Sequence, residues 1–91
     1  QVSIYPNPSY SQHSLNIVNI PENAKISITN LKGEIMYTLG NKDAENTFIN
    51  GAGINVSTFS LSNFPLAKGI YLVSVQSNKL GKSYTTKWIV L

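Results

Sequence analysis

The chain has 91 residues, no cysteine and a formal net charge of +3 at pH 7. This length allows one domain with a single modest core, and the lack of cysteine excludes disulfide bonds and thiolate chemistry. The basic residues are all scattered lysines, whereas specific nucleic-acid contacts favour clustered basic residues and arginine forks, so no nucleic-acid partner is expected.

No apolar run approaches the roughly 20 residues that span a bilayer, so we expect a soluble domain without membrane insertion. The first residues lack the sections of a signal peptide and have the pattern of a strand from the start. We therefore expect residues 1–91 to form a single domain cut from a longer protein, whose export signal would lie upstream.

The N-terminal part of the chain predicts two short strands. Val2–Tyr5 is ended by the motif Tyr5-Pro6-Asn7-Pro8, because each proline fixes φ and removes a backbone donor. Such a strand is expected at a sheet edge. After a polar connection, Leu15 and Ile17 alternate with their neighbours in a second strand.

A β-hairpin is expected next. Lys25–Thr29 alternates isoleucine with polar residues, as in a strand with one wet face. Asn30-Leu31-Lys32-Gly33 then forms a tight turn, with Gly33 at the position that requires positive φ. The partner strand, Glu34–Leu39, is expected to place three residues on one face, namely Ile35, Tyr37 and Leu39.

The middle of the chain predicts two further strands and a loop. Asn46–Asn50 is a candidate short strand, and Ile54–Phe59 has clear strand character. In the loop Ser62–Lys68 that follows, a hydrophobic residue, Phe64 or Leu66, is expected to close one end of the core.

The longest aromatic and β-branched run, Gly69–Gln76, is expected to be the central strand. One of its faces carries Tyr71, Val73 and Val75. Ile70 and Leu72 lie on the other face, so the strand is expected to be buried on both sides at its start. A hairpin turn then leads into the last strand, Ser83–Leu91.

No stretch has helical periodicity over the roughly 10 residues that indicate a helix. About seven short strands separated by turns, each with one apolar face, must bury those faces against a second sheet. The sequence therefore predicts an all-β fold, an immunoglobulin-like antiparallel β-sandwich.

Residues with catalytic or ligand-binding chemistry are sparse. The only histidine, His13, and the only aspartate, Asp43, both lie in polar loops, which favours solvated side chains over a catalytic triad. One histidine and four scattered acids give no metal-ligand spacing, although loop carbonyls could hold an incidental Ca²⁺. No catalytic residue, cofactor or metal site is predicted.

Two short motifs are better explained by the fold. Gly81-Lys82-Ser83 has the ending of a phosphate-binding loop, but the required earlier glycine is absent and a strand follows, so we interpret it as part of a hairpin turn. Asn55-Val56-Ser57 matches a glycosylation pattern, and we interpret it as strand sequence.

Three features occur in order along the chain: Tyr5-Pro6-Asn7-Pro8, then Gly69-Ile70-Tyr71-Leu72-Val73, and finally Lys87-Trp88-Ile89-Val90-Leu91. Together they resemble the type A C-terminal sorting domain of the type IX (Por) secretion system of Bacteroidota. The turn that ends at Gly33 and the stretch Leu61–Phe64 also look like this family, so the resemblance covers essentially the whole chain.

The resemblance implies a non-catalytic sorting signal that directs an attached upstream cargo protein through the periplasm and across the outer membrane. The implied partners are the outer-membrane export machinery and a sortase-like surface peptidase that commonly removes the domain. The implied destination is the cell surface or the medium. A folded sandwich could display its last strand as an edge, and we expect the recognised residues to be Lys87, Trp88, Ile89, Val90 and Leu91. Those expected to maintain the fold are Tyr5, Pro6, Asn7, Pro8, Gly33, Gly69 and Tyr71.

Two alternatives stay open. In the first, Trp88 and Val90 of the last strand only close the core. In the second, the domain is an accessory or adhesion module that binds carbohydrate or a neighbouring domain through an exposed aromatic patch. An enzyme ranks behind both, because the sequence does not assemble an acid, a base and a nucleophile.

Overall fold

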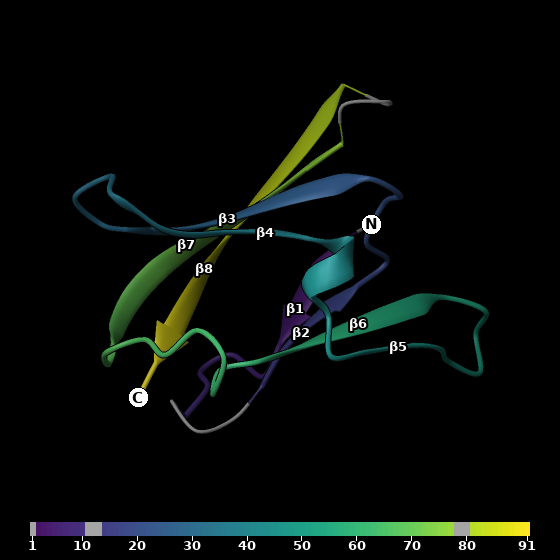
Figure 1. The fold of residues 1–91 in the computed structure, drawn as a ribbon, viewed down its shortest axis with the longest axis horizontal. Coiled ribbons are helices and arrows are strands. Elements are labelled where there is room, and N and C mark those ends of the chain that lie inside the picture. The colour runs from purple at the N-terminus through teal and green to yellow at the C-terminus, as the bar shows by residue number, and fades with distance from the viewer. Residues whose placement is uncertain (1, 11–13, 78–80) are drawn as a thin grey trace.

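A computed structural model of the chain describes residues 2–10, 14–77 and 81–91 and has the form of a two-sheet β-sandwich (Figure 1). Its eight described strands are β1 (Ser3–Tyr5), β2 (Ser14–Val18), β3 (Ala24–Asn30), β4 (Ile35–Gly40), β5 (Asn46–Ile49), β6 (Asn55–Ser60), β7 (Gly69–Ser77) and β8 (Lys82–Val90). A single 3₁₀ turn, η1 (Asn41–Asp43), follows β4. The candidate strand at residues 46–50 is thus confirmed as β5, and eight described strands agree with the expected number of about seven.

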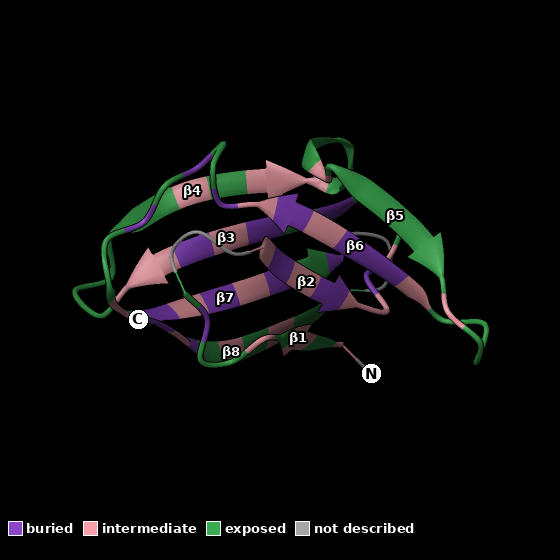
Figure 2. Cartoon of the chain, turned by 90° about the horizontal axis from the view of Figure 1, so that it is seen from below, coloured by how far each residue is buried: buried purple, intermediate pink, exposed green. Residues whose placement is uncertain are grey.

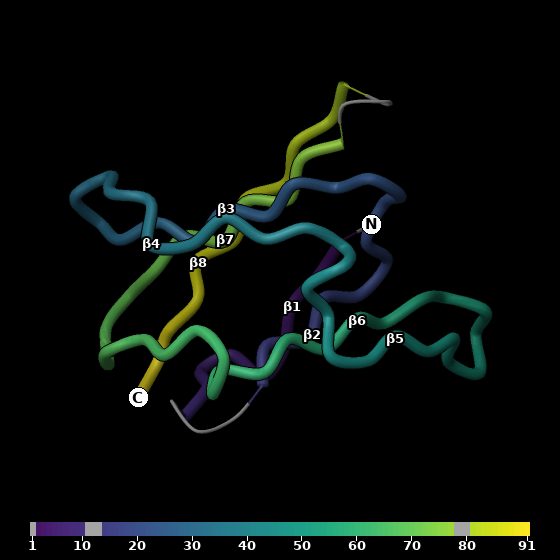
Figure 3. The backbone as a smooth tube through the Cα atoms, viewed as in Figure 1, coloured from purple at the N-terminus to yellow at the C-terminus, as the bar shows by residue number. Residues whose placement is uncertain are grey.

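The two sheets have the strand orders β1-β2-β6-β5 and β4-β3-β7-β8, and all pairs of neighbouring strands are antiparallel. These orders correspond to the A-B-E-D and C′-C-F-G strands of immunoglobulin-like domains, which confirms the predicted fold class. The backbone trace in Figure 3 shows the three hairpins, β3–β4, β5–β6 and β7–β8, extending beyond the sandwich in different directions.

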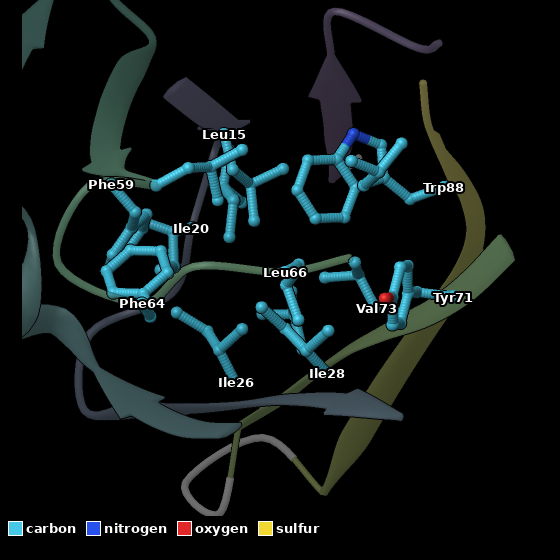
Figure 4. Packing of buried hydrophobic residues seen from close by; sticks show 14 of the residues in the cluster. Leu15, Ile20, Ile26, Ile28, Phe59, Phe64, Leu66, Tyr71, Val73 and Trp88 are labelled. Carbon is cyan, nitrogen blue, oxygen red and sulfur yellow. The ribbon is translucent and has the colours of Figure 1, made fainter. Parts of the chain in front are cut away.

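The core lies between the sheets, and both contribute to it through alternate residues (Figure 4). Leu15, Ile17 and Phe59 come from one sheet, and Ile26, Ile28, Val73 and Val75 from the other. Phe64 and Leu66 of the long loop are both buried, as predicted, and the Phe64 ring packs between those of Tyr37 and Phe59. Both loop residues therefore close the core.

Two hairpin turns are held by an asparagine at their first position. The Asn30 side-chain oxygen accepts hydrogen bonds from the backbone N–H groups of Lys32 and Glu34. Asn50 does the same for the turn between β5 and β6. Each turn ends in a glycine with positive φ, +89° at Gly33 and +78° at Gly53, so the predicted role of Gly33 is confirmed.

Tyr71 fastens the long loop to β7. Its ring is buried beside Gly69, and its hydroxyl donates to the carbonyl of Ala67, four residues upstream. This arrangement corresponds to the tyrosine corner at the start of strand F in immunoglobulin-like domains. Because the hydroxyl is satisfied within the loop, the ring enters the core without leaving a polar atom unpaired.

Two predictions about strand faces are wrong. Ile35 was expected on the same face as Tyr37 and Leu39, but a β-bulge shifts the register so that Tyr37 pairs with Ile28 and Ile35 with Thr29. Ile35 therefore faces outward and is 63% exposed. Ile70 was expected to be buried but is 40% exposed, because buried and more exposed residues alternate along β7 from its start (Figure 2).

Candidate recognition site on the terminal strand

The last strand divides its side chains between the core and the outer face of its sheet. Trp88 and Val90 are buried, and their exposed fractions are 0% and 1%. Lys87, Ile89 and Leu91 alternate with them and lie on the opposite face, where Leu91 is 50% exposed. The predicted site therefore comprises two groups of residues, of which only one is accessible in the folded domain.

A segment near the N-terminus covers the backbone of this strand. Ser9 lies in a parallel bridge beside Val90, where its N–H donates to the carbonyl of Ile89 at 2.7 Å and its carbonyl accepts from the N–H of Leu91 at 2.7 Å. Ser9 itself is fully buried. The first and last segments of the chain thus form one continuous structure, although 80 residues separate them.

Asn7 continues this contact with its side chain. The amide nitrogen donates to the carbonyl of Lys87 at 2.8 Å, and the amide oxygen accepts from the N–H of Ile89 at 3.1 Å. The N–H and C=O of a single residue in a neighbouring parallel strand would form the same two bonds. The Asn7 amide therefore substitutes for a strand residue at this position.

The indole of Trp88 completes the contact from the core side. Its Nε1–H donates to the carbonyl of Pro6 at 3.1 Å. Because a proline residue lacks a donor but keeps its acceptor, the motif Pro6-Asn7-Pro8 presents the Pro6 carbonyl and the Asn7 side-chain amide to the terminal strand. We name the segment Pro6–Ser9 the N-terminal clamp.

The clamp corrects the expectation that the last strand displays its edge. β8 is an edge strand, but all the outward backbone groups from the carbonyl of Lys87 to the N–H of Leu91 are already bonded to the clamp. By the same alternation, Ser83 and Thr85 direct their backbone groups outward and have no backbone partner among the described residues. The edge is therefore open only before Lys87.

The outer face of this sheet is apolar at one end and polar at the other. At the apolar end, Ile70 of β7 pairs with Ile89 of β8. In the next row, Leu72 of β7 pairs with Lys87 of β8 and, on its other side, with Thr29 of β3. Thr29 in turn pairs with Ile35 of β4. At the opposite end Ser74 and Thr85 share a hydrogen bond of 3.0 Å. We name Ile35, Ile70, Leu72 and Ile89 the outer apolar patch.

The fold-maintaining residues expected from the sequence have distinct places. Tyr5 ends β1, Pro6, Asn7 and Pro8 belong to the clamp, and Tyr71 anchors the long loop at the start of β7. The connection between the clamp and the terminal strand was not foreseen. The only local signal was the donor-poor Pro-Asn-Pro sequence, which indicated the end of a strand but not its partner.

The other motifs do not assemble a site. His13 lies outside the described residues, and the Asp43 carboxylate accepts from the N–H of Gly40 at 2.8 Å in the turn after β4. Among the described residues, no group of three or more histidines, cysteines or acids could hold a metal ion. Asn55-Val56-Ser57 lies in β6, as predicted, and the Asn55 side chain accepts from the N–H of Ile20. No helix in the described ranges is long and apolar enough to cross a membrane.

Comparisons with known proteins agree with this architecture. No protein among those with curated descriptions matches the chain. A solved structure of PorZ, a surface component of the type IX secretion system of Porphyromonas gingivalis, aligns with 99% of this chain at a TM-score of 0.68 and 19% identity. This chain covers 11% of that protein, and at this identity the likeness shows the fold alone.

Family membership rests on the sequence match. Residues 3–91 match the family described as "Secretion system C-terminal sorting domain". The match includes β1, the clamp and the terminal strand, which are the segments that the structure joins. The chain therefore belongs to the family of type IX secretion system C-terminal sorting domains.

Proposed function

We propose that this domain directs an attached upstream cargo protein through the periplasm and across the outer membrane, and that the export machinery recognises the domain in its folded form. The observation that carries the proposal is the family match over residues 3–91, which implies export by type IX secretion to the surface or beyond. In this role the domain is a substrate of the machinery and not an enzyme.

The terminal residues Lys87–Leu91 are the proposed contact region. Two structural features support a folded signal. Trp88 and Val90 are buried, so direct contact with them would require unfolding of the strand. The clamp also holds the strand in place through backbone and side-chain hydrogen bonds. We assign Trp88 and Val90 to maintaining the strand and its outward neighbours to contact.

A fusion experiment tests the function. A fluorescent reporter with an inner-membrane export signal would be joined to this domain and produced in a bacterium that has type IX secretion. We expect fluorescence at the cell surface or in the medium, and retention in the periplasm when residues 1–91 are deleted. Equal delivery with and without the domain would refute the sorting role.

Removal by a sortase-like surface peptidase is the second part of the proposal. Mass spectrometry of the delivered reporter should find its peptides without those of residues 1–91, and inactivation of the peptidase should leave the domain attached. Delivery of a reporter that still carries the whole domain in normal cells would contradict removal, but not sorting.

The accessory-module alternative receives little support from the exposed aromatic residues. Tyr5 and Phe48 are each 44% exposed and lie on the outer face of the same sheet, but on its two opposite edge strands. Three strand spacings of about 4.8 Å separate such positions, so the two rings do not form one stacking platform.

A further inference from the structure

In the folded domain, a partner protein can contact the terminal strand only through the strand's outward side chains. Its core-facing residues are buried, and the outward backbone groups from the carbonyl of Lys87 onward are bonded to the clamp. A strand added by a partner along Lys87–Leu91 would first have to displace Asn7 and Ser9. The accessible features of this region are therefore the Lys87 ammonium and the apolar Ile89 and Leu91 side chains.

These side chains do not stand alone, because the neighbouring strands extend the apolar surface. Ile70, which is 40% exposed, lies directly opposite Ile89, and directly paired residues on one face of a sheet are in side-chain contact. Leu72 lies opposite Lys87, and Ile35 continues the row beyond Thr29 with 63% exposure. The bulge in β4 is what adds Ile35 to this surface.

The charges of this sheet have one sign. The strands β3, β4, β7 and β8 contain three lysines and no carboxylate. Lys87 lies at the border of the outer apolar patch, whereas Lys25 lies at the polar end of the same face, opposite Gln76. The strands of this surface thus combine an exposed apolar area with the adjacent Lys87 cation, which complements an apolar surface that carries an acidic group. The acid nearest in sequence to the patch, Glu34, precedes β4, and its carboxylate accepts a hydrogen bond from the Asn30 side chain at 2.9 Å.

We propose that the outer apolar patch, with Lys87 at its border, is the docking surface for a component of the export machinery that presents apolar side chains and a carboxylate. This inference rests on the proposed sorting function and specifies its contact. The partner contacts side chains from three strands, which only the folded domain brings together. It does not bind the backbone of a free terminal strand.

The principal test replaces apolar contact without disturbing the core. The double variant Ile70→Thr/Ile89→Thr keeps β-branched residues at a directly paired position, so the strands are retained while apolar area is lost. We expect delivery of the reporter fusion to fall roughly tenfold, as for the loss of a central contact in an interface. Circular dichroism and thermal unfolding of the purified domain would verify that it remains folded.

A matched control has the same chemistry on the other sheet. Ile49 and Ile54 are 65% and 37% exposed in the β5–β6 hairpin, and Ile49→Thr/Ile54→Thr should leave delivery unchanged. For the charge, Lys87→Glu should reduce delivery and Lys87→Arg should preserve it, whereas Lys25→Glu at the polar end should have no effect. Equal effects of the two double variants would overturn the proposal.

A photo-crosslinking residue in place of Ile70 identifies the occupant. An adduct with an outer-membrane component of the export machinery, absent when the same residue replaces Ile49, supports the proposal. An adduct only with the attached cargo overturns it. A dimer of the purified domain that becomes monomeric in the Ile70→Thr/Ile89→Thr variant, without loss of delivery, overturns it in favour of self-association.

Recognition by strand addition predicts a different pattern. Thr85→Pro removes an outward N–H from the open part of the edge, a position where an edge strand tolerates proline. If this folded variant loses delivery while Ile70→Thr/Ile89→Thr does not, the open edge is the contact and the proposal is wrong. Deletion of residues 1–91 distinguishes this outcome from failure of the sorting function. If delivery is lost on deletion, the domain is a sorting signal and only the contact was wrongly assigned. If delivery is intact on deletion, the sorting function itself is wrong.

Discussion

The side chain of Asn7 forms two hydrogen bonds with the backbone around Ile89, as a residue of an adjoining strand would. Its oxygen accepts from the Ile89 N–H, and its nitrogen donates to the carbonyl of Lys87. Only a short side-chain amide offers both groups in this geometry, since a carboxylate cannot donate and glutamine adds a methylene. The Pro-Asn-Pro sequence therefore acts as a closure for the edge of the terminal strand.

Two substitutions of Asn7 should distinguish the contributions of these two hydrogen bonds to stability. Asn7→Asp keeps the acceptor for Ile89 but loses the donor, and we expect the free energy of unfolding to fall by about 1 kcal/mol. Asn7→Ala loses both bonds and should cost about 2 kcal/mol. In hydrogen exchange measured by NMR, the Ile89 amide should exchange faster in the alanine variant and stay protected in the aspartate variant.

Asn41 provides a matched control for Asn7. Its amide bridges two backbone groups in the same way, accepting from the N–H of Ala24 at 2.9 Å and donating to the carbonyl of Pro21 at 3.1 Å. Asn41→Ala should therefore lower the stability by a similar amount without faster exchange at Ile89. Unchanged Ile89 exchange in Asn7→Ala would contradict the closure of the edge.

Trp88 links the clamp to the core, and its substitutions should reveal both roles. Trp88→Phe retains an aromatic ring but leaves the Pro6 carbonyl without its donor, for an expected loss of about 1–3 kcal/mol. Trp88→Ala also empties a site with 0% exposure and should cost about 3–5 kcal/mol. Urea unfolding followed by circular dichroism measures both, because the only tryptophan is lost.

Equal stability of Trp88→Phe and the wild type would show that the indole bond to Pro6 contributes nothing. The alanine variant bears on the sorting signal as well. If the folded strand is what the machinery recognises, this variant should lose export in proportion to the fraction unfolded, because the side chain itself is inaccessible.

Local sequence patterns predicted the strands because alternation and turn chemistry act over a few residues. Lys25–Thr29 and its turn at Gly33 illustrate this, since the isoleucines are buried and the glycine has positive φ. Ile70 illustrates the limit, because an apolar residue on the second face of a strand does not reveal whether another layer covers that face. The bulge that turns Ile35 outward depends on cross-strand register and has no local signal.

The candidate site was only partly predictable for a related reason. The terminal residues could be identified by resemblance, but the clamp joins Asn7 to Lys87 and Ile89 across 80 and 82 residues. No periodicity or turn rule connects positions so far apart. The contact that closes the edge therefore depends on the tertiary fold, in which the sandwich brings β1 and β8 to the same side.

Tyr71 should contribute more to stability through its hydroxyl than Tyr37. The Tyr71 ring is only 6% exposed and its hydroxyl bonds to Ala67, whereas the half-buried Tyr37 bonds to Pro65 at 2.8 Å in an exposed setting. Tyr71→Phe should lower the free energy of unfolding by about 1–2 kcal/mol, and Tyr37→Phe by about 0.5 kcal/mol. Chemical denaturation of both variants gives the comparison, and a larger loss in Tyr37→Phe would contradict this account of the corner.

Gly33 should be required because its φ is positive, and not because a larger side chain would clash with neighbouring atoms. No atom lies within 4 Å of the position that an added Cβ would occupy, yet φ is +89°. Gly33→Ala should therefore cost about 1–2 kcal/mol from backbone conformation alone. Gly51 is the matched control, since it is equally open but lacks positive φ, and Gly51→Ala should be neutral or stabilise by about 0.5 kcal/mol. Thermal and denaturant unfolding measure both, and equal destabilisation of the two variants would assign the cost to something other than the turn geometry at Gly33.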